Sequence, residues 1–264
     1  MLTGLTQLNI ELSSRCDRHT LCGFCGHQDR KTNPNLMLGD IDFDLLVKIC
    51  FQIDSPIVVS FHRDGDPLVY GRLKEALQLF TVNGFPTSIV THGEALNRRA
   101  DDIIDNCTSV TVSVIPNDKD RQLQLESLHG FLAKKGNKKP MMQLKCVGNV
   151  TDLGPYEELG IPITNRPLHS KKGNWTYQTP PKRPEINVCL DFLGRPTVDW
   201  RGRVFICNRL DTTDSGLIGD LNKQSLDEIW NGPERKAMLQ HHLAGRRDLA
   251  NSLCASCNFW GVPS

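Results

Sequence analysis

The ten cysteines of this chain constrain its fold and chemistry more than any other feature of the sequence. Three lie near the N-terminus, three are scattered through the middle, and four fall in the last 76 residues: Cys16, Cys22, Cys25; Cys50, Cys107, Cys146; Cys189, Cys207, Cys254, Cys257. A chain of 264 residues buries enough surface to fold without covalent cross-links. Clustered cysteines in a cytosolic chain of this length bind metal or carry out chemistry more often than they form disulfides. We therefore interpret the first and last groups as metal or iron–sulfur sites.

Charge and hydropathy exclude two large classes of function. The chain has 31 basic and 30 acidic side chains, a net charge of +1, and no segregated basic block. Nucleic acids and anionic membranes are bound through basic faces. The longest apolar runs, such as Val110 to Ile115, are far too short to span a membrane. Residues 1–12 show no signal-peptide pattern, so we expect a cytoplasmic protein without membrane or nucleic-acid partners.

Apolar periodicity and turn residues predict strands that alternate with helices over the first two thirds of the chain. Strands are expected at Leu8–Leu12, Ile57–His62, Thr87–Thr91, Ser109–Ile115, Met141–Val147 and Ile161–Leu168. Helices are expected at Asp42–Ile53, Leu73–Val82, Leu96–Asn106, Gln122–Lys135 and Tyr156–Leu159. Short connections between them favour parallel strands with right-handed crossovers. Six units are too few to close an eight-stranded barrel, so residues 1–172 are predicted to form an α/β fold, a partial (β/α)6 barrel.

A smaller C-terminal domain is predicted over residues 173–264. Residues 173–184 have the composition of a linker, a hairpin is expected at Thr197–Ile206, and a helix begins at Leu226. For His241, His242 and the run Gly245–Arg247, a solvated helix face is the expectation. The sequence thus predicts a small cysteine-rich unit built from a β-hairpin plus a helix.

Alternation within the predicted strands places polar side chains on one shared face of the sheet. These residues are Asn9, Glu11, Ser60, His62, Thr111, Ser113, Gln143 and Lys145. Any one of them alone fits a hydrogen-bonded interior polar group equally well. Because they share one orientation on successive strands, we expect this face to line a ligand-filled barrel interior, with the apolar face packed on helices.

The first cysteine group directly follows the first predicted strand. Five residues and then two separate Cys16, Cys22 and Cys25, so one loop carries three thiolates. Three thiolates can hold three irons of a 4Fe–4S cluster and leave one iron open to an external ligand. A zinc site completed by His19 or His27 fits the spacing equally well.

The motifs that follow resemble the radical S-adenosylmethionine (SAM) superfamily, from about Leu8 to Trp260. Its loop carries an aromatic residue before the third cysteine, as Phe24 does here, although its first cysteine gap is three residues rather than five. Gly65–Pro67 is similar to its Gly-Glu-Pro motif, with Asp66 for Glu, and Thr91–Gly93 is similar to its Thr-Asn-Gly motif, with His92 for Asn. Ser113 matches a serine that faces the cofactor. The resemblance implies that SAM and its 4Fe–4S cluster are held by Cys16, Cys22, Cys25, Phe24, Gly65, Asp66, Pro67, His92 and Ser113.

The last four cysteines form a closed set of ligands. Four thiolates suit either a fully ligated iron–sulfur cluster or structural zinc, and spacing alone favours zinc. Within the superfamily, however, the pattern is similar to the auxiliary-cluster appendage called SPASM or, in its short form, twitch. The matching segments are Gly202 to Cys207, Leu226–Trp230 and Cys254 to Cys257. The resemblance implies one auxiliary 4Fe–4S cluster held by Cys189, Cys207, Cys254 and Cys257.

The resemblance also implies a reaction. The superfamily cleaves SAM reductively to a 5′-deoxyadenosyl radical that removes hydrogen from a substrate, with a flavodoxin- or ferredoxin-type protein as reductant. An auxiliary cluster favours net oxidation. About seven residues precede the first strand, short for a peptide-leader module, and the architecture is most similar to the 2-deoxy-scyllo-inosamine dehydrogenase family. We therefore expect an oxidoreductase acting on a small polar metabolite, cyclitol or sugar-like.

Oxidation of an alcohol needs a base for the hydroxyl proton. Polar candidates near strand ends are Lys145 and His62, together with His169 and Arg166. A thiol that returns hydrogen would suit an epimerase, but alternation directs Cys146 toward the helices. Two alternatives stay open: a radical SAM epimerase or peptide-modifying maturase, and a zinc-stabilised binding protein without turnover.

Overall fold

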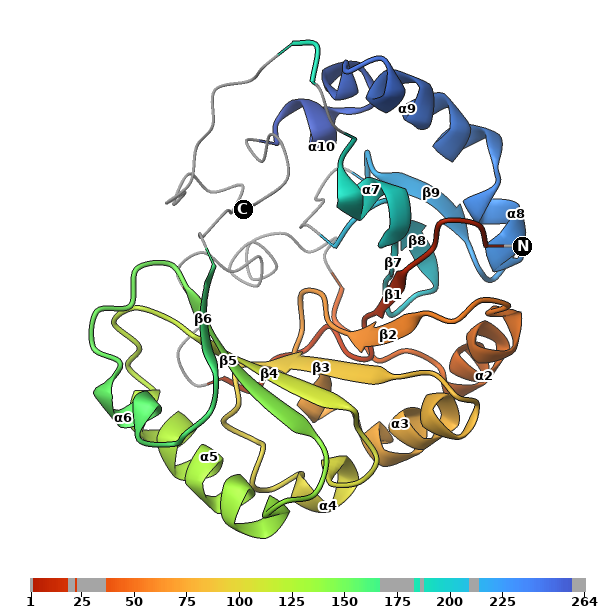
Figure 1. Cartoon of the computed structure of the whole chain (residues 1–264). Helices are drawn as coiled ribbons and strands as arrows, with labels where there is room; N and C mark the ends of the chain where they lie inside the picture. The colour runs from red at the N-terminus through yellow and green to blue at the C-terminus, as the bar shows by residue number, and fades with distance from the viewer. Residues whose placement is uncertain are drawn as a thin grey trace.

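One open sheet organises the molecule (Figure 1). The computed structural model describes residues 2–18, 22, 37–166, 183–185, 188–208 and 214–257. In this part of the chain the strand order is β6-β5-β4-β3-β2-β1-β7-β8-β9. The strands are β1 Gln7–Ile10, β2 Val58–Phe61, β3 Thr87–Thr91, β4 Ser109–Val114, β5 Met141–Val147, β6 Ile163–Arg166, β7 Thr197–Val198, β8 Arg203–Phe205 and β9 Leu217–Asp220. Each neighbouring pair from β1 to β6 is parallel, which confirms the partial (β/α)6 barrel.

Helices cover one face of the barrel strands, as Figure 1 shows for α2–α5. Their bounds are α2 Phe43–Gln52, α3 Leu73–Val82, α4 Ala100–Ile103, α5 Arg121–Lys135 and α6 Gly154–Glu157. The strand residues facing them are apolar: Ile10, Phe61, Ile89 and Val110 are paired in register across β1–β4 and fully buried. Burial of this row against amphipathic helices supplies the main hydrophobic stabilisation of the fold.

The opposite face is polar, as the alternation predicted. Asn9 of β1 pairs in register with Ser60 of β2, and Ser60 pairs with Ser88 of β3. At the other end of the barrel, Ser113 pairs with Lys145, and Lys145 pairs with Thr164. Residues directly opposite one another on neighbouring strands point to the same face. The shared polar face is therefore confirmed.

One helix is shorter than expected. The sequence predicts a helix at Leu96–Asn106, whereas α4 has only four residues. The N–H of Asn97 donates to Ser127 Oγ at 3.1 Å, and the residues before Ala100 form turns. At the other end, Ile104 has extended backbone and Asp105 has φ 63°, which ends the helix.

The C-terminal region extends the same sheet. β7 is parallel to β1, with Asn9 opposite Thr197, and β8 is antiparallel to β7, which confirms the predicted hairpin. The expected helix at Leu226 is α8 Leu226–Trp230, which begins at a capping box formed by Ser225 and Glu228. The helix expected at His241 and His242 is α9 Pro233–Leu243. Strand β9 and the helices α7 Leu190–Gly194, η2 Arg247–Leu249 and α10 Ser252–Ala255 were not predicted. Residues 167–182 lie outside the described ranges, so the domain boundary at 172 stays a prediction.

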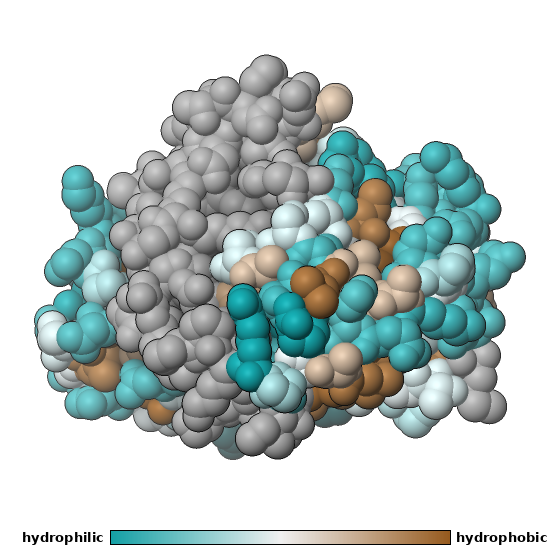
Figure 2. Space-filling view, turned by 90° about the horizontal axis from the view of Figure 1, so that it is seen from above, coloured by the Kyte–Doolittle hydropathy of each residue, from teal (hydrophilic) through white to brown (hydrophobic). Residues whose placement is uncertain are grey.

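The surface of the described residues is mixed. From above, Figure 2 shows hydrophilic residues with hydrophobic ones scattered among them. In the part of the chain that the structure describes, no helix is both long enough and apolar enough to cross a membrane.

Candidate functional site

Asp66 joins the loops that follow β1, β2 and β3. Its N–H donates to the carbonyl of Arg15, in the loop after β1, at 2.8 Å. Its buried carboxylate accepts hydrogen bonds from Leu68 N at 2.9 Å, Thr91 Oγ1 at 2.7 Å and His92 N at 3.0 Å. The structure thus brings together the cysteine loop and the two motifs Gly65–Pro67 and Thr91–Gly93. The aspartate that replaces the glutamate of the superfamily motif fixes the geometry of this junction.

Two glycines make the close approach of these loops possible. A Cβ on Gly65 would lie 2.1 Å from the carbonyl oxygen of Ser13, so only glycine fits there. Gly93 has φ +90°, a conformation that residues with a side chain rarely adopt. Glu11 adds a further tie, since its buried carboxylate accepts from Gly65 N and from Trp200 N, each at 3.4 Å. The C-terminal hairpin is thereby connected to the same junction.

His92 lies between acidic groups and the first cysteine. Its Nε2 atom is 3.3 Å from Asp17 Oδ1 and 3.3 Å from Asp66 Oδ2. Burial opposes protonation of His92, but the hydrogen bond to Asp17 and the nearby Cys16 and Asp66 outweigh it and raise the pKa of His92 to about 11. The same hydrogen bond from His92 lowers the pKa of Asp17 to about 2. The loop of Cys16 is therefore held by a charged pair.

Arg18 connects the cysteine loop to the end of β4. Its side chain is 2% exposed and forms ion pairs with Glu94 at 3.4 Å, with Asp120 at 3.7 Å and with Asp118. Its Nη1 donates to Cys22 Sγ at 3.0 Å. Burial raises the pKa of the Cys22 thiol, and the guanidinium of Arg18 opposes that effect. A thiolate at Cys22 therefore has a buried cation beside it, which fits a metal ligand. Phe24, Cys25, His19 and His27 lie outside the described residues.

Gln124 fixes the ends of β3 and β4. It is 1% exposed, and its Nε2 donates to the carbonyl of His92 and to that of Ser113, the latter at 2.9 Å. Its Oε1 accepts from Tyr156 Oη at 2.6 Å. Sequence reasoning missed the roles of both residues, although each lies in a helix that the sequence predicts.

The expected base candidates lie along the polar face. Lys145 is half-buried in β5 opposite Ser113, and His62 is half-buried directly after β2. Arg166 ends β6, and His169 lies outside the described residues. Cys146 is fully buried and pairs with Val114 on the helix-covered face, as the alternation predicted.

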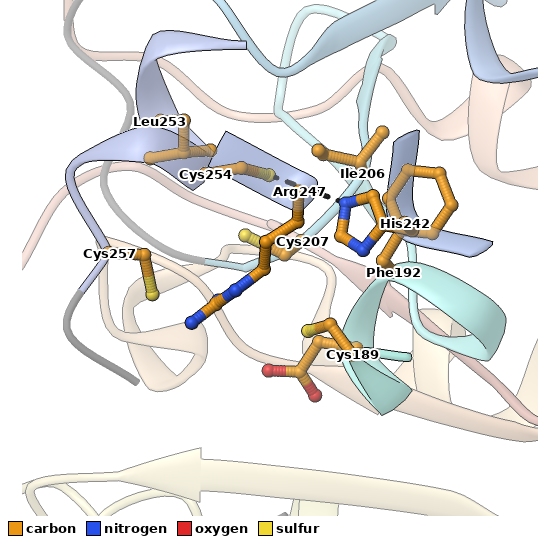
Figure 3. Close-up of a pocket in the computed structure, with 10 residues that line it drawn as sticks. Cys189, Phe192, Ile206, Cys207, His242, Arg247, Leu253, Cys254 and Cys257 are labelled. Carbon is orange, nitrogen blue, oxygen red and sulfur yellow. Dashed lines mark hydrogen bonds between the residues drawn. The ribbon is translucent and has the colours of Figure 1, made fainter. Parts of the chain in front are cut away.

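The four C-terminal cysteines line one pocket. Cys189 precedes α7, Cys207 follows β8, Cys254 lies in α10 and Cys257 lies just beyond it. Figure 3 shows the four sulfur-bearing side chains around a common space. None of the nine described cysteines forms a disulfide. Among the described residues, no three His, Cys, Asp or Glu side chains form a site for a single metal ion.

The pocket disfavours free thiolates. Burial, together with the nearby Cys189 and Cys257, raises the pKa of Cys254 to about 12. Burial also raises the pKa of Cys189. A bound metal group deprotonates its thiol ligands and offsets this cost. Four soft sulfur donors around a shared cavity therefore fit an iron–sulfur cluster.

Two residues expected on a solvated helix face lie in this pocket instead. His242 is 3% exposed and stacks on Phe192, with ring centroids 4.0 Å apart. Its Nε2 is 3.7 Å from Cys254 Sγ. Burial, with nearby Arg247 and His241, lowers the pKa of His242 to about 4. Arg247 is also buried and lines the pocket. The prediction of a solvated face was wrong for both, because packing on α7 and α10 covers them.

Comparisons with known proteins agree with this arrangement. Residues 189–258 match the SPASM family, described as an iron–sulfur cluster-binding domain. The fold is similar to that of BtrN in complex with AdoMet and 2-DOIA, with a TM-score of 0.62 and 17% identity over 96% of this chain and 93% of that one. It is also similar to SuiB from Streptococcus suis bound to S-adenosylmethionine, with a TM-score of 0.56 and 12% identity over 97% of this chain and 71% of that one. No curated protein matches the chain significantly by sequence.

These findings decide between the alternatives left by the cysteine spacing. The SPASM match covers all four C-terminal cysteines and favours an iron–sulfur cluster over structural zinc. Iron–sulfur clusters and SAM are the cofactors that the motifs imply, and both structural neighbours were solved with SAM bound. The chain thus shares the fold of BtrN and SuiB, and its residues 189–258 match the SPASM iron–sulfur cluster-binding domain.

Proposed function

We propose that this chain is a radical SAM oxidoreductase that oxidises a small polar metabolite, a cyclitol or sugar-like alcohol. The observation that carries the proposal is the pocket of four cysteines, of which Cys207 follows the hairpin that continues the barrel sheet. A redox group in that pocket would lie next to the sheet whose polar face is expected to bind the substrate.

The residues divide into two cofactor sites. Cys16, Cys22 and Cys25 would hold the SAM-binding cluster, with Phe24, Gly65, Asp66, Pro67, His92 and Ser113 around SAM. Cys189, Cys207, Cys254 and Cys257 would hold the auxiliary cluster. When bound, these cofactors supply a 5′-deoxyadenosyl radical that takes a hydrogen atom from the substrate carbon and an acceptor for the electron that remains. A flavodoxin- or ferredoxin-type protein is the proposed reductant.

The chain itself would bind and deprotonate the substrate. Lys145 and its register partner Thr164 offer an amine and a hydroxyl group on the polar face, which suit a polyhydroxylated ligand. Lys145 and His62 are the proposed acceptors of the hydroxyl proton, and both lie on or just beyond strands of this face. Loss of a hydrogen atom, one electron and one proton converts the alcohol to a ketone.

The comparisons support two substrate classes unequally. BtrN was solved with 2-DOIA, and this chain and BtrN cover more than nine tenths of each other. SuiB, solved in another structure with the precursor peptide SuiA, includes more chain outside the match. We therefore keep a peptide-modifying enzyme or epimerase as the second candidate.

Metal analysis of anaerobically purified protein tests the proposal first. We expect about eight irons per chain, and about four after Cys22→Ala and Cys25→Ala. Cys50→Ala and Cys107→Ala are matched controls, because both thiols are buried away from the two cysteine groups, and they should leave the iron count unchanged. Zinc in place of iron would contradict the proposal.

Substrate oxidation is tested with the loaded enzyme. With cyclitols and amino sugars as substrates, the enzyme should release 5′-deoxyadenosine and form one equivalent of ketone per 5′-deoxyadenosine. With peptides it should release neither product. Release with peptides alone would favour the second candidate. Release without substrate oxidation would favour an epimerase.

A further inference from the structure

Arg247 lines the pocket of the four C-terminal cysteines and forms a buried ion pair with Glu185. The side chain of Arg247 is 3% exposed, and its Nε is 2.8 Å from Glu185 Oε2. The Glu185 side chain is only 9% exposed. Burying both charges is costly unless they pair with each other or with a further charged group. Arg247 of this pair also shares a pocket with the four cysteines, so a group bound by them would lie near its charge.

The chain is shaped to place this pair. Gly245 has φ +69°, and a Cβ there would lie 2.6 Å from the carbonyl oxygen of Glu185. Its own carbonyl accepts from Glu185 N at 2.9 Å. Only glycine permits this approach, which carries the next turn, with Arg247, into the pocket. The preceding Arg246 pairs instead with Asp248 at the surface, where its side chain is 42% exposed.

The guanidinium faces the sulfur ligands. Figure 3 shows the side chain of Arg247 extending into the space bounded by Cys189, Cys254 and Cys257. Arg247 lines the same pocket as Cys189, which precedes α7, and Cys254, which lies in α10. The cation therefore interacts favourably with negative charge on ligands from two separate elements.

A fixed cation beside a cluster acts on its reduction potential. A one-electron reduction adds one negative charge to the cluster, and a buried pocket screens charges weakly. A nearby cation stabilises the reduced form, while a carboxylate does the opposite. Net charge around a cluster is one of the factors that set its potential.

We propose that Arg247, held by Glu185, raises the reduction potential of the auxiliary cluster so that it accepts an electron from the substrate. This inference rests on the proposed function, because it assumes an iron–sulfur cluster in the pocket. Arg247 is on this view a tuning residue that touches no substrate.

An electron paramagnetic resonance redox titration tests it. The chain Cys16→Ala/Cys22→Ala/Cys25→Ala retains only the auxiliary site and is the parent for all variants. Arg247→Gln should shift the oxidised-to-reduced ratio at a fixed ambient potential at least tenfold toward the oxidised form, or about 59 mV for a one-electron couple. Arg246→Gln makes the same chemical change one residue away at the surface and should shift the ratio less than twofold. Arg247→Lys should retain most of the parent potential.

Glu185→Gln should shift the reduction potential in the direction opposite to Arg247→Gln. Removing the carboxylate should raise the potential, whereas a merely structural role would lower cluster content in both variants without opposite shifts. If Arg247→Gln loses iron, the reduction potentials of Glu185→Gln and Arg247→Lys test the inference instead: a raised potential in the first and a retained potential in the second support it, and any other result overturns it. A parent with four irons and equal potentials for Arg247→Gln and Arg246→Gln overturns this inference alone. A parent without iron overturns the proposed function as well.

Discussion

Replacing Gln124 should destabilise the protein far more than its position on a helix suggests. The side chain is 1% exposed and makes three hydrogen bonds, to the carbonyls of His92 and Ser113 and from Tyr156 Oη. Each such bond contributes about 1 kcal/mol net, and a buried group left unpaired costs about 1–3 kcal/mol. Gln124→Leu removes all three bonds while keeping a similar volume. We expect a loss of about 3 kcal/mol in the free energy of unfolding.

Thermal unfolding of the anaerobic protein measures this loss. In a chain of this size, 1 kcal/mol corresponds to about 2–4 °C, so Tm should fall by about 6–12 °C. Gln122→Leu is the matched control, because Gln122 is exposed on the same helix and its side chain donates to Glu126 Oε1 at 2.9 Å. An i,i+4 pair of this kind contributes about 0.2–0.5 kcal/mol, so its Tm should change by about 1 °C.

A double-variant cycle isolates the hydroxyl contact. Tyr156→Phe alone should cost about 1–2 kcal/mol, since it removes one buried partner of Gln124. In the Gln124→Leu background the same change should cost clearly less, because the two side chains interact. A Tm for Gln124→Leu within 2 °C of that for Gln122→Leu would refute the reasoning.

Three further predictions concern the first cysteine loop and the buried phenols. Arg18→Gln should lower the iron count of the full chain from about eight toward about four, because Cys22 loses its buried cation. The control Arg98→Gln replaces a 68% exposed arginine and should leave the iron count unchanged. Equal iron counts in the two variants would contradict a role of Arg18 in holding the cluster. Gly65→Ala should lose the same irons, since its Cβ would lie 2.1 Å from the Ser13 carbonyl oxygen. An unchanged iron count would show that the loop moves to accommodate the Cβ and would contradict this prediction. Burial raises the pKa of Tyr70 and Tyr156 to about 12, against about 10 when unfolded. Their stabilising contribution should therefore be present below about pH 10 and lost as the pH rises toward 12, and phenolate absorbance from both tyrosines at pH 10 in the folded protein would contradict this.

Local patterns predicted the barrel well. Helix α3 and strands β3 and β5 have the bounds expected from periodicity and turn residues. The motifs Gly65–Pro67 and Thr91–Gly93 lie together as expected, because parallel strands end at the same edge of a sheet. Both the bounds of these elements and the position of the two motifs depend on residues close together in the sequence.

Long-range contacts explain what the sequence did not predict. Gln124 contacts Tyr156 across 32 residues, and no periodicity marks such a pair. His242 and Arg247 carry polar side chains on short segments, so they resemble a solvated face until α7 and α10 are placed over them. The two-residue strand β7 is too short to show alternation, and its pairing with β1 joins residues about 190 positions apart.

That pairing has a consequence for any attempt to divide the chain. β1 lies between β2 and β7, so the N-terminal strand is an interior strand only while the C-terminal hairpin is present. A fragment ending at residue 172 would expose the edge of β1, with unpaired N–H and C=O groups beside buried Ile10. Exposed edges of this kind recruit other chains and aggregate. We therefore expect the barrel to depend on the C-terminal hairpin for its solubility.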